Sequence, residues 1–374
     1  MGCGSMSETV QQKFVDPMES AERIFLKAIR QNPEINKYIL GVSGGTDSVV
    51  AASLAVKFAK KHGIDLSDFI VMHANTGTAI PQSKLVAKVF AEQHGLEYVE
   101  AGPRNPQDYL AVRVLNNGWA GQYGGSPATG GHGLEWANRK NKPMQAVYMM
   151  YEGKQLWFSG TRVSESKKRS VNLGSRAIDQ DDQSPRRTWV SLIYSWDSSD
   201  KVEFIKDRRL PVSEAYEILG YSGECTACAY DDKGLLNDIG LLSPELAYCL
   251  KTLAVWVGLR AVRGDIDIDP KQLCWGWDPE TDGDEDTDKT QKELVPLAEG
   301  DVLNGGGNKI GEYEIPDSVN ETTAQQMVGC AGGGCSTRQS PPWVSDLPRE
   351  QIVTREDTFI AWNDSAAAVS ERFA

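Results

Sequence analysis

A short run of glycine and hydroxyl residues follows an apolar segment near the start of the chain. Residues 43–48 have the sequence Ser-Gly-Gly-Thr-Asp-Ser and come directly after the apolar run Tyr38–Val42. Such a run is typical of a buried parallel strand, and the Ala- and Val-rich stretch Val49–Lys61 predicts a helix that ends near Gly63. A strand, a glycine loop and a helix in this order present unpaired N–H groups and the positive end of a helix dipole. The segment indicates a phosphate site, with a tight turn capped by a serine as the alternative.

The loop itself is expected to hold the phosphates. Its glycines allow the backbone to approach a ligand closely, and its hydroxyls add hydrogen-bond donors. Asp47 is expected to bind magnesium or to order the loop; as an acidic residue in the first helical turn, it could also simply complement the dipole. The predicted nucleotide-binding residues of the loop are Ser43, Gly44, Gly45, Thr46, Asp47 and Ser48.

Four of the seven cysteines form two close pairs. Cys225 and Cys228 make a CxxC pair, and Cys330 and Cys335 form a second pair on a glycine-rich stretch. Four thiolates suit Zn²⁺ or a [4Fe–4S] cluster, and ligand softness does not choose between these two. Cys274 could replace one of the ligands. The alternative is a set of buried free cysteines; a disulfide framework is not expected, because the number is odd and the compartment reducing.

Alternating strand and helix patterns position these residues. After the glycine loop and its helix, the sequence predicts a strand at Phe69–His73, a helix at Gln82–His94 and a strand at Glu97–Ala101. Further strands are expected at Leu156–Ser159 and Trp189–Ile193. Repeated βα units imply a parallel sheet with helices on both faces. The predicted fold class is therefore α/β, with a Rossmann-like sheet.

Two domains are expected. Residues 1–215 would form the nucleotide-binding α/β domain, and residues 216–374 a smaller lobe that carries the cysteine site and an acidic linker at about 278–301. Outside the sheet, apolar helical patterns predict helices at Ala21–Arg30 and Glu245–Arg260.

Charge is distributed unevenly along the chain. Of the net charge of −13, the segment Gly264–Asp301 contributes −10, which is typical of a solvated linker that repels polyanions. Gly160–Val190 holds seven Arg or Lys residues against four acidic ones, and this local surplus attracts anions. No apolar run is long enough to cross a bilayer, and Met1–Val10 lacks the pattern of a secretory signal. We therefore expect a cytoplasmic protein without membrane contact.

The glycine loop resembles the PP-loop of the adenine nucleotide α-hydrolase superfamily, because the full Ser-Gly-Gly-x-Asp-Ser string follows a buried strand. It is not a Walker A loop, since no Gly-Lys-Ser or Gly-Lys-Thr follows. Further stretches are similar to the phosphoadenylylsulfate reductase branch of that superfamily. These are His73–Gly77 with Pro81, Gly160–Ser166 with Arg169, and the segment from Trp196 to Tyr216 ahead of the first cysteine pair.

The resemblance implies that the loop holds the pyrophosphate of ATP while the α-phosphate is attacked, with Mg²⁺ offsetting the charge. Arg162 and Arg169 suit phosphate or sulfate oxygens, and Glu165 could orient a guanidinium or bind magnesium. A solvated helix start is the alternative. The expected catalytic residues are Asp47, Arg162, Glu165 and Arg169. Nucleotide-binding residues expected outside the loop, where open α/β sheets bind ligands, are His73, Asn75, Thr76, Gly77, Gly160 and Arg162.

The stretch around Cys225 is similar to the cysteine-bearing element of reductase-like and DNA-phosphorothioation proteins, several of which carry iron–sulfur clusters. Neither the Glu-Cys-Gly segment nor the Cys-Cys tandem of the reductases occurs, and the glycine loop is intact. We therefore expect an ATP pyrophosphatase that adenylates an acceptor for sulfur incorporation, as in DNA phosphorothioation. Its partners would belong to a sulfur-transfer system with a cysteine desulfurase, and DNA would be met through a partner. The alternatives are a phosphoadenylylsulfate reductase, a tRNA thiolation enzyme and a nucleotide-binding subunit without catalysis.

Overall fold

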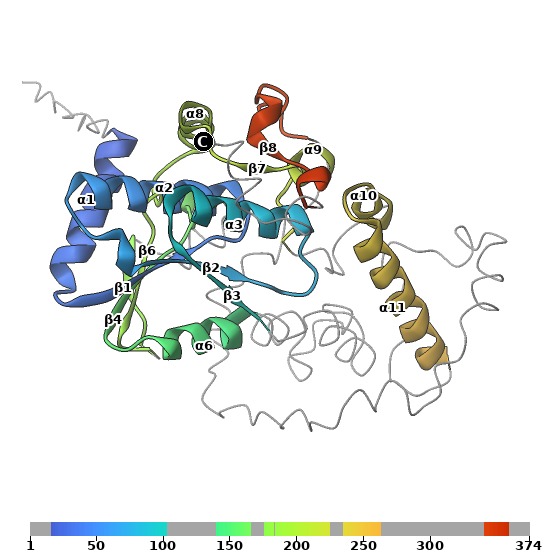
Figure 1. The fold of residues 1–374 in the computed structure, drawn as a ribbon, viewed down its shortest axis with the longest axis horizontal. Helices are drawn as coiled ribbons and strands as arrows, with labels where there is room; N and C mark the ends of the chain where they lie inside the picture. Colours follow the sequence, from blue (N-terminus) through green and yellow to red (C-terminus); the bar gives the residue numbers. More distant parts are fainter. Residues whose placement is uncertain are drawn as a thin grey trace, which may run out of the picture.

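A computed structural model describes residues 16–102, 140–165, 176–182, 184–224, 235–262 and 340–358 (Figure 1). A six-stranded sheet lies at its centre, with the strand order β3-β2-β1-β4-β6-β5. Its strands are β1 (Ile35–Gly41), β2 (Phe69–Ala74), β3 (Glu97–Ala101), β4 (Lys154–Phe158), β5 (Ile178–Gln180) and β6 (Arg187–Val190). The pairings of β1, β2, β3, β4 and β6 are parallel. The predicted Rossmann-like fold class is confirmed, with one difference: β5 runs antiparallel to β6.

The helices described are α1 (Pro17–Gln31), α2 (Thr46–Lys61), α3 (Pro81–His94), α6 (Lys142–Met150), α8 (Ser198–Arg208), α9 (Ala215–Ile218), α10 (Leu235–Leu242) and α11 (Pro244–Val262). The first of these begins four residues before the predicted Ala21, because the Asp16 side chain accepts a hydrogen bond from the Met18 N–H and Pro17 suits the first helical position. Within the described residues, no helix has the length and apolar character needed to span a membrane.

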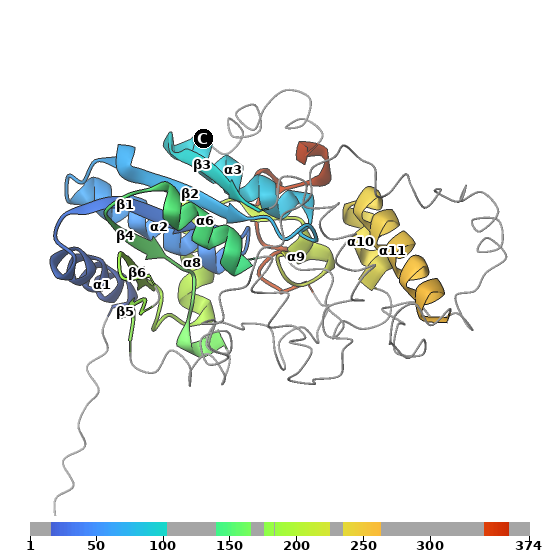
Figure 2. The same ribbon diagram turned by 90° about the horizontal axis from the view of Figure 1, so that it is seen from below.

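Alternate residues of the central strands belong to opposite layers. Leu40 and Phe158 lie in the larger core, which packs against α1, α2, α3 and α8, whereas Ile39 and Trp157 lie in the core that α6 covers. Figures 1 and 2 show α6 on the face of the sheet opposite α2. Because β1 is covered on both faces, Tyr38, Ile39 and Leu40 are all buried, as the continuous apolar run predicts.

The last strand of the parallel set is shorter than predicted. The sequence indicates Trp189–Ile193, but β6 spans Arg187–Val190. The chain turns directly after it, since the Ser191 N–H donates to the Ala177 carbonyl and the Tyr194 N–H to that of Ser191. This turn brings the following residues back toward the carboxyl edge of the sheet, where the Val163 N–H donates to the Tyr194 carbonyl.

Residues 340–358 pack against the α/β domain, although they come late in the chain. Strand β7 (Val212–Ser213) pairs in parallel with β8 (Ile352–Val353). Val344 and Leu347 lie with β8 in the same core as β1 and α2. The boundary near residue 215 stays a prediction, but the described part of the second lobe includes a segment that shares the core of the first.

Candidate active site

The loop Ser43–Ser48 connects β1 to α2 at the carboxyl edge of the sheet, where β1 lies between β2 and β4. Its serine hydroxyls hold the loop closed. The Ser43 N–H donates to Ser48 Oγ at 3.1 Å, Ser48 Oγ donates to the Gly45 carbonyl at 2.7 Å, and the Gly45 N–H donates to Ser43 Oγ at 3.3 Å. The loop is therefore preorganised, with these hydroxyls engaged in its own conformation.

Glycine is required in this loop and next to it by close backbone contacts. Gly44 has φ +88, and a Cβ there would lie 2.2 Å from the Ser83 carbonyl oxygen. A Cβ on Gly160, after β4, would lie 2.4 Å from the carbonyl carbon of Asp47 and from the Ser48 nitrogen. The segment after β4 thus lies directly against the first turn of α2, a contact that only glycine permits.

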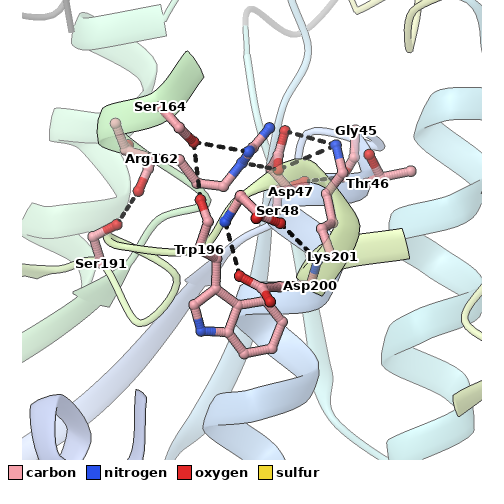
Figure 3. A network of polar contacts seen from close by, with 12 residues as sticks. Gly45, Thr46, Asp47, Ser48, Arg162, Ser164, Ser191, Trp196, Asp200 and Lys201 are labelled. Carbon is pink, nitrogen blue, oxygen red and sulfur yellow. Dashed lines mark hydrogen bonds and ion pairs between the residues drawn. The ribbon is translucent and has the colours of Figure 1, made fainter. Parts of the chain in front are cut away.

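Asp47 is partly exposed and lies at the centre of a group of charges whose two cations are buried (Figure 3). Arg162 Nε lies 2.6 Å from Asp47 Oδ1, and Lys201 Nζ lies 3.4 Å from the same oxygen. Arg162 Nη1 donates to Ser164 Oγ at 3.1 Å, and that hydroxyl donates to the Trp196 carbonyl at 2.9 Å. Arg162 and Lys201 are only 5% and 8% exposed. The segment after β4, which carries Arg162, and helix α8, which carries Lys201, therefore meet at the start of α2.

Lys201 is a residue of this group that sequence reasoning missed. It lies in the first turn of α8, within the segment from Trp196 to Tyr216 that is similar to the reductase branch. No role was expected for it from the sequence. One signal was present: Phe204 and Ile205, three and four residues later, are apolar and buried, so Lys201 lies on the inward face of that helix. A lysine on an apolar helical face indicates a buried partner for its charge.

The predicted residues at the end of β2 form a second polar group. His73 Nδ1 lies 3.0 Å from the Val42 carbonyl, so that nitrogen carries the proton, while the buried Nε2 has no hydrogen-bond partner. Complete burial lowers the pKa of His73 and keeps the ring neutral. His73 therefore offers a buried acceptor atom, Nε2. In the same polar group, Asn75 Oδ1 accepts from the Gly77 N–H at 2.9 Å, and Asn75 Nδ2 donates to Glu100 Oε1 at 2.5 Å.

The segment that leads to the first cysteine pair lies against this second group. Thr76 Oγ1 donates to the Glu224 carbonyl at 3.1 Å, and the Ile80 N–H donates to the Gly223 carbonyl at 2.8 Å. Ser83 Oγ hydrogen-bonds the Ser222 carbonyl. Earlier in the same segment, the Tyr216 hydroxyl contacts the glycine loop and accepts a hydrogen bond from the Thr46 N–H at 3.1 Å. The loop after β2 and the segment 216–224 thus form one packed unit with the glycine loop.

Several predicted site residues lie outside the described residues. They are Arg169, Cys225, Cys228, Cys274, Cys330 and Cys335. Glu165 lies in the short helix Val163–Glu165, and the structure describes only its backbone. In the described part of the chain, no three His, Cys, Asp or Glu side chains gather as a metal site. Asp47 does not fit as a magnesium ligand, because its carboxylate faces two cations.

Residues 37–222 match the model of the phosphoadenosine phosphosulfate reductase domain. The resemblance to the phosphoadenylylsulfate reductase branch of the PP-loop superfamily, noted from the sequence, is thereby confirmed, and the members of that group are enzymes that act on nucleotides. No curated protein matches the chain.

Solved structures with a similar fold come from different enzymes. Phosphoadenylyl-sulfate reductase from Candida auris is 15% identical with a TM-score of 0.36, covering 56% of this chain and 91% of its own. The U34-tRNA thiolase NcsA from Methanococcus maripaludis, with its [4Fe-4S] cluster, is 14% identical with a TM-score of 0.38, covering 68% and 82%. The NH3-dependent NAD synthetase of Campylobacter jejuni is 15% identical with a TM-score of 0.35, covering 75% and 95%.

Proposed function

We propose that this chain is an ATP pyrophosphatase that adenylates an acceptor for sulfur incorporation. An acceptor oxygen attacks the α-phosphorus of ATP, the bond from that phosphorus to the bridging oxygen breaks, and pyrophosphate leaves with the electron pair. The observation that carries the proposal is the closed glycine loop at the start of α2, beside the cations Arg162 and Lys201. A helix N-terminus and buried cations favour the negative charge of phosphates.

The other end of the nucleotide would be held where β2 ends. His73 is neutral, and its buried Nε2 accepts hydrogen bonds only. The exocyclic amine of adenine is a donor that suits this atom. Asn75 and Thr76 are held by Glu100 and by the Glu224 carbonyl, so they shape the wall of the site. Magnesium would arrive on the phosphates of the nucleotide, since Asp47 is engaged by cations.

DNA is the acceptor that we propose, as part of a phosphorothioation system with a cysteine desulfurase as sulfur source. The net charge of −13 opposes tight binding of a polyanion, so a partner would present the DNA. Cys225, Cys228, Cys330 and Cys335, with Cys274 as a substitute, would hold a [4Fe–4S] cluster or Zn²⁺. We place the protein in the cytoplasm, where the reducing conditions would keep these thiols free to bind a metal.

A second candidate function is reduction of phosphoadenylylsulfate, which the family match over residues 37–222 favours. The two activities have different products. Purified protein is incubated with α-labelled ATP and acceptor DNA, and release of AMP and pyrophosphate is measured; in parallel, phosphoadenylylsulfate and a thiol are supplied and sulfite is measured. ATP cleavage supports the proposal, and sulfite release with intact ATP supports the reductase.

Variants connect either activity to the loop. Ser48→Ala removes the hydroxyl that bonds both Ser43 and Gly45, and we expect a loss of about tenfold or more in turnover, since a misplaced loop costs transition-state stabilisation. Glu19→Gln, on the exposed face of α1, is the control and should keep full activity. Nucleotide binding without cleavage, with or without DNA, would instead indicate a non-catalytic subunit.

A further inference from the structure

Gly45, in the glycine loop, is a glycine that the fold itself does not demand. Its backbone has φ −78 and ψ 147, which other residues adopt as well, whereas Gly44 has φ +88. The nearest atoms to a Cβ built on Gly45 belong to side chains: Ser43 Oγ at 3.3 Å, Ser222 Oγ at 3.6 Å and Ser222 Cβ at 3.7 Å. The point that this glycine leaves vacant is therefore faced by two hydroxyls, which suits the approach of an acceptor oxygen.

Ser222 is held beside the loop by its backbone. Ser83 Oγ donates to the Ser222 carbonyl, and the next carbonyl, that of Gly223, accepts from the Ile80 N–H at 2.8 Å. Gly220 and Gly223 have φ +76 and +66, a conformation that glycine adopts without strain, so the chain turns on both sides of Ser222. The backbone thus fixes the place of the hydroxyl before any ligand arrives.

The Ser222 hydroxyl differs from the other hydroxyls at the loop because it is not engaged. Ser43 Oγ and Ser48 Oγ lie 3.2 Å apart and bond the backbone of the loop, and Thr46 Oγ1 lies 3.2 Å from the Tyr216 hydroxyl. Within the residues that the structure describes, Ser222 Oγ makes no hydrogen bond, and the residue is partly exposed. A hydroxyl with an unused donor, next to the first turn of a helix, suits a phosphate oxygen.

We propose that Ser222 is a substrate-binding residue, whose hydroxyl donates a hydrogen bond to the pyrophosphate portion of the nucleotide. This inference rests on the proposed function, because it takes the glycine loop as the phosphate site. The phosphates are then bound from two sides, by the start of α2 and by a segment far along the chain. The segment 216–224 accordingly takes part in binding as well as in packing.

The test is a calorimetric titration of the full chain in Mg²⁺, once with inorganic pyrophosphate and once with ATP. Ser222→Ala should raise both Kd values about tenfold, as expected for the loss of a hydrogen bond to a charged group. Ser222→Thr keeps the hydroxyl and should stay within about threefold of wild type. Ser67→Ala is the control and should change nothing, because it removes an exposed serine hydroxyl just ahead of β2, at the opposite edge of the sheet.

Gly45→Ala tests the same point from the loop. Its methyl group would lie within 3.6 Å of both hydroxyls, and we expect the Kd for pyrophosphate to rise about tenfold or more, with thermal unfolding close to that of wild type.

The outcomes separate this inference from the proposed function. Wild-type affinity of Ser222→Ala for pyrophosphate, a loss confined to ATP, or a loss in Ser222→Thr as large as in Ser222→Ala overturns the role of Ser222 and leaves the proposed function standing. If Ser222→Ala is poorly folded, Gly45→Ala still decides, and unchanged affinity there overturns the inference. Failure of wild type to bind either pyrophosphate or ATP overturns both proposals.

Discussion

At the scale of single residues, the site depends on how Asp47 is paired. Its contact with Arg162 is short and nearly buried, at 2.6 Å with the arginine side chain 6% exposed. Arg162 is engaged by Ser164 as well. A guanidinium held in this way is fixed in position before any ligand arrives, which is how charged groups stabilise a transition state without reorganising.

Replacing Asp47 by asparagine should therefore destabilise the fold strongly. The buried side chains of Arg162 and Lys201 would each lose the Asp47 carboxylate as a partner, and breaking a buried pair from one side costs about 3–5 kcal/mol. The measurement is urea unfolding. The matched control is Asp68→Asn, which breaks the half-exposed Lys37–Asp68 pair and should cost under about 1 kcal/mol. Equal losses in the two variants would contradict the role of Asp47 as the partner of two buried cations.

The buried His73 and the partly buried His94 predict how stability depends on pH. Burial lowers the pKa of His73, and it lowers the pKa of His94 to about 4, whereas an unfolded histidine titrates near 6.5. Between these values the unfolded chain binds more protons, so stability is full above pH 6.5 and falls as the pH drops toward 4. Urea midpoints at pH 7.5 and 5 should show this loss. His94→Gln should show a smaller loss than wild type, and an identical pH dependence would argue against the shift.

At the scale of elements, the site is a junction between the start of α2 and the segment after β4. Gly41 shows how tightly the strands themselves approach at this edge, since a Cβ there would lie 3.2 Å from the Phe158 carbonyl oxygen. Gly160 lies two residues beyond Phe158 and meets the backbone of α2. The position of Arg162 is thus set by the contact of Gly160 with the backbone of α2 and by the ion pair between Arg162 and Asp47.

Gly160→Ala should move the segment after β4 away from the start of α2. The new methyl group would lie 2.4 Å from backbone atoms of Asp47 and Ser48, and overpacking of this kind costs about 1–3 kcal/mol. We also expect weaker binding of ATP in a filter or calorimetric assay, because Arg162 moves with the segment. Gly63→Ala is the control: its Cβ would meet nothing within 4 Å, although its φ of +67 causes strain. If Gly63→Ala lost as much affinity for ATP as Gly160→Ala, the contact of Gly160 with α2 would not be what positions Arg162.

At the scale of the whole molecule, residues 340–358 pack against elements that contact the glycine loop. Strand β8 pairs with β7, and the Trp343 ring lies 5.9 Å from that of Tyr216, whose hydroxyl contacts Thr46. Gln351 Nε2 donates to the carbonyls of Ile205 at 3.0 Å and Leu210 at 2.9 Å. Residues 340–358 are therefore an integral part of the α/β domain.

Ile352→Ala should show this dependence. The side chain is 1% exposed within the main core, and truncation of such a residue costs about 2–5 kcal/mol. Ser345→Ala lies on the exposed surface of the same segment and should stay within about 0.5 kcal/mol of wild type. Chemical unfolding of both variants is the measurement. A loss at Ile352 no larger than at Ser345 would mean that the segment does not support the domain.

Local patterns were sufficient for much of the sheet and for the loop. The strand at Glu97–Ala101 has its predicted bounds, and the helix after the loop ends at Lys61 as expected, because apolar runs and glycine stops act over a few residues. The bounds of β6 and the start of α1 were not predicted correctly, because a turn ends β6 and a helix cap begins α1. Arg162 lies buried against Asp47 in the structure, and its expected role toward phosphate oxygens stays a prediction.

The sequence by itself determined the class of fold and the position of the glycine loop, because a buried strand, a glycine turn and a helix are encoded by neighbouring residues. Only the tertiary structure decided that Lys201 joins Asp47, that Glu100 holds Asn75 and that Tyr216 contacts Thr46. The Lys201 and Tyr216 partners lie 154 and 170 positions away along the chain. No local pattern encodes such pairs; they form because the crossover connections bring the carboxyl ends of separate strands, and the segments after them, to one edge of the sheet.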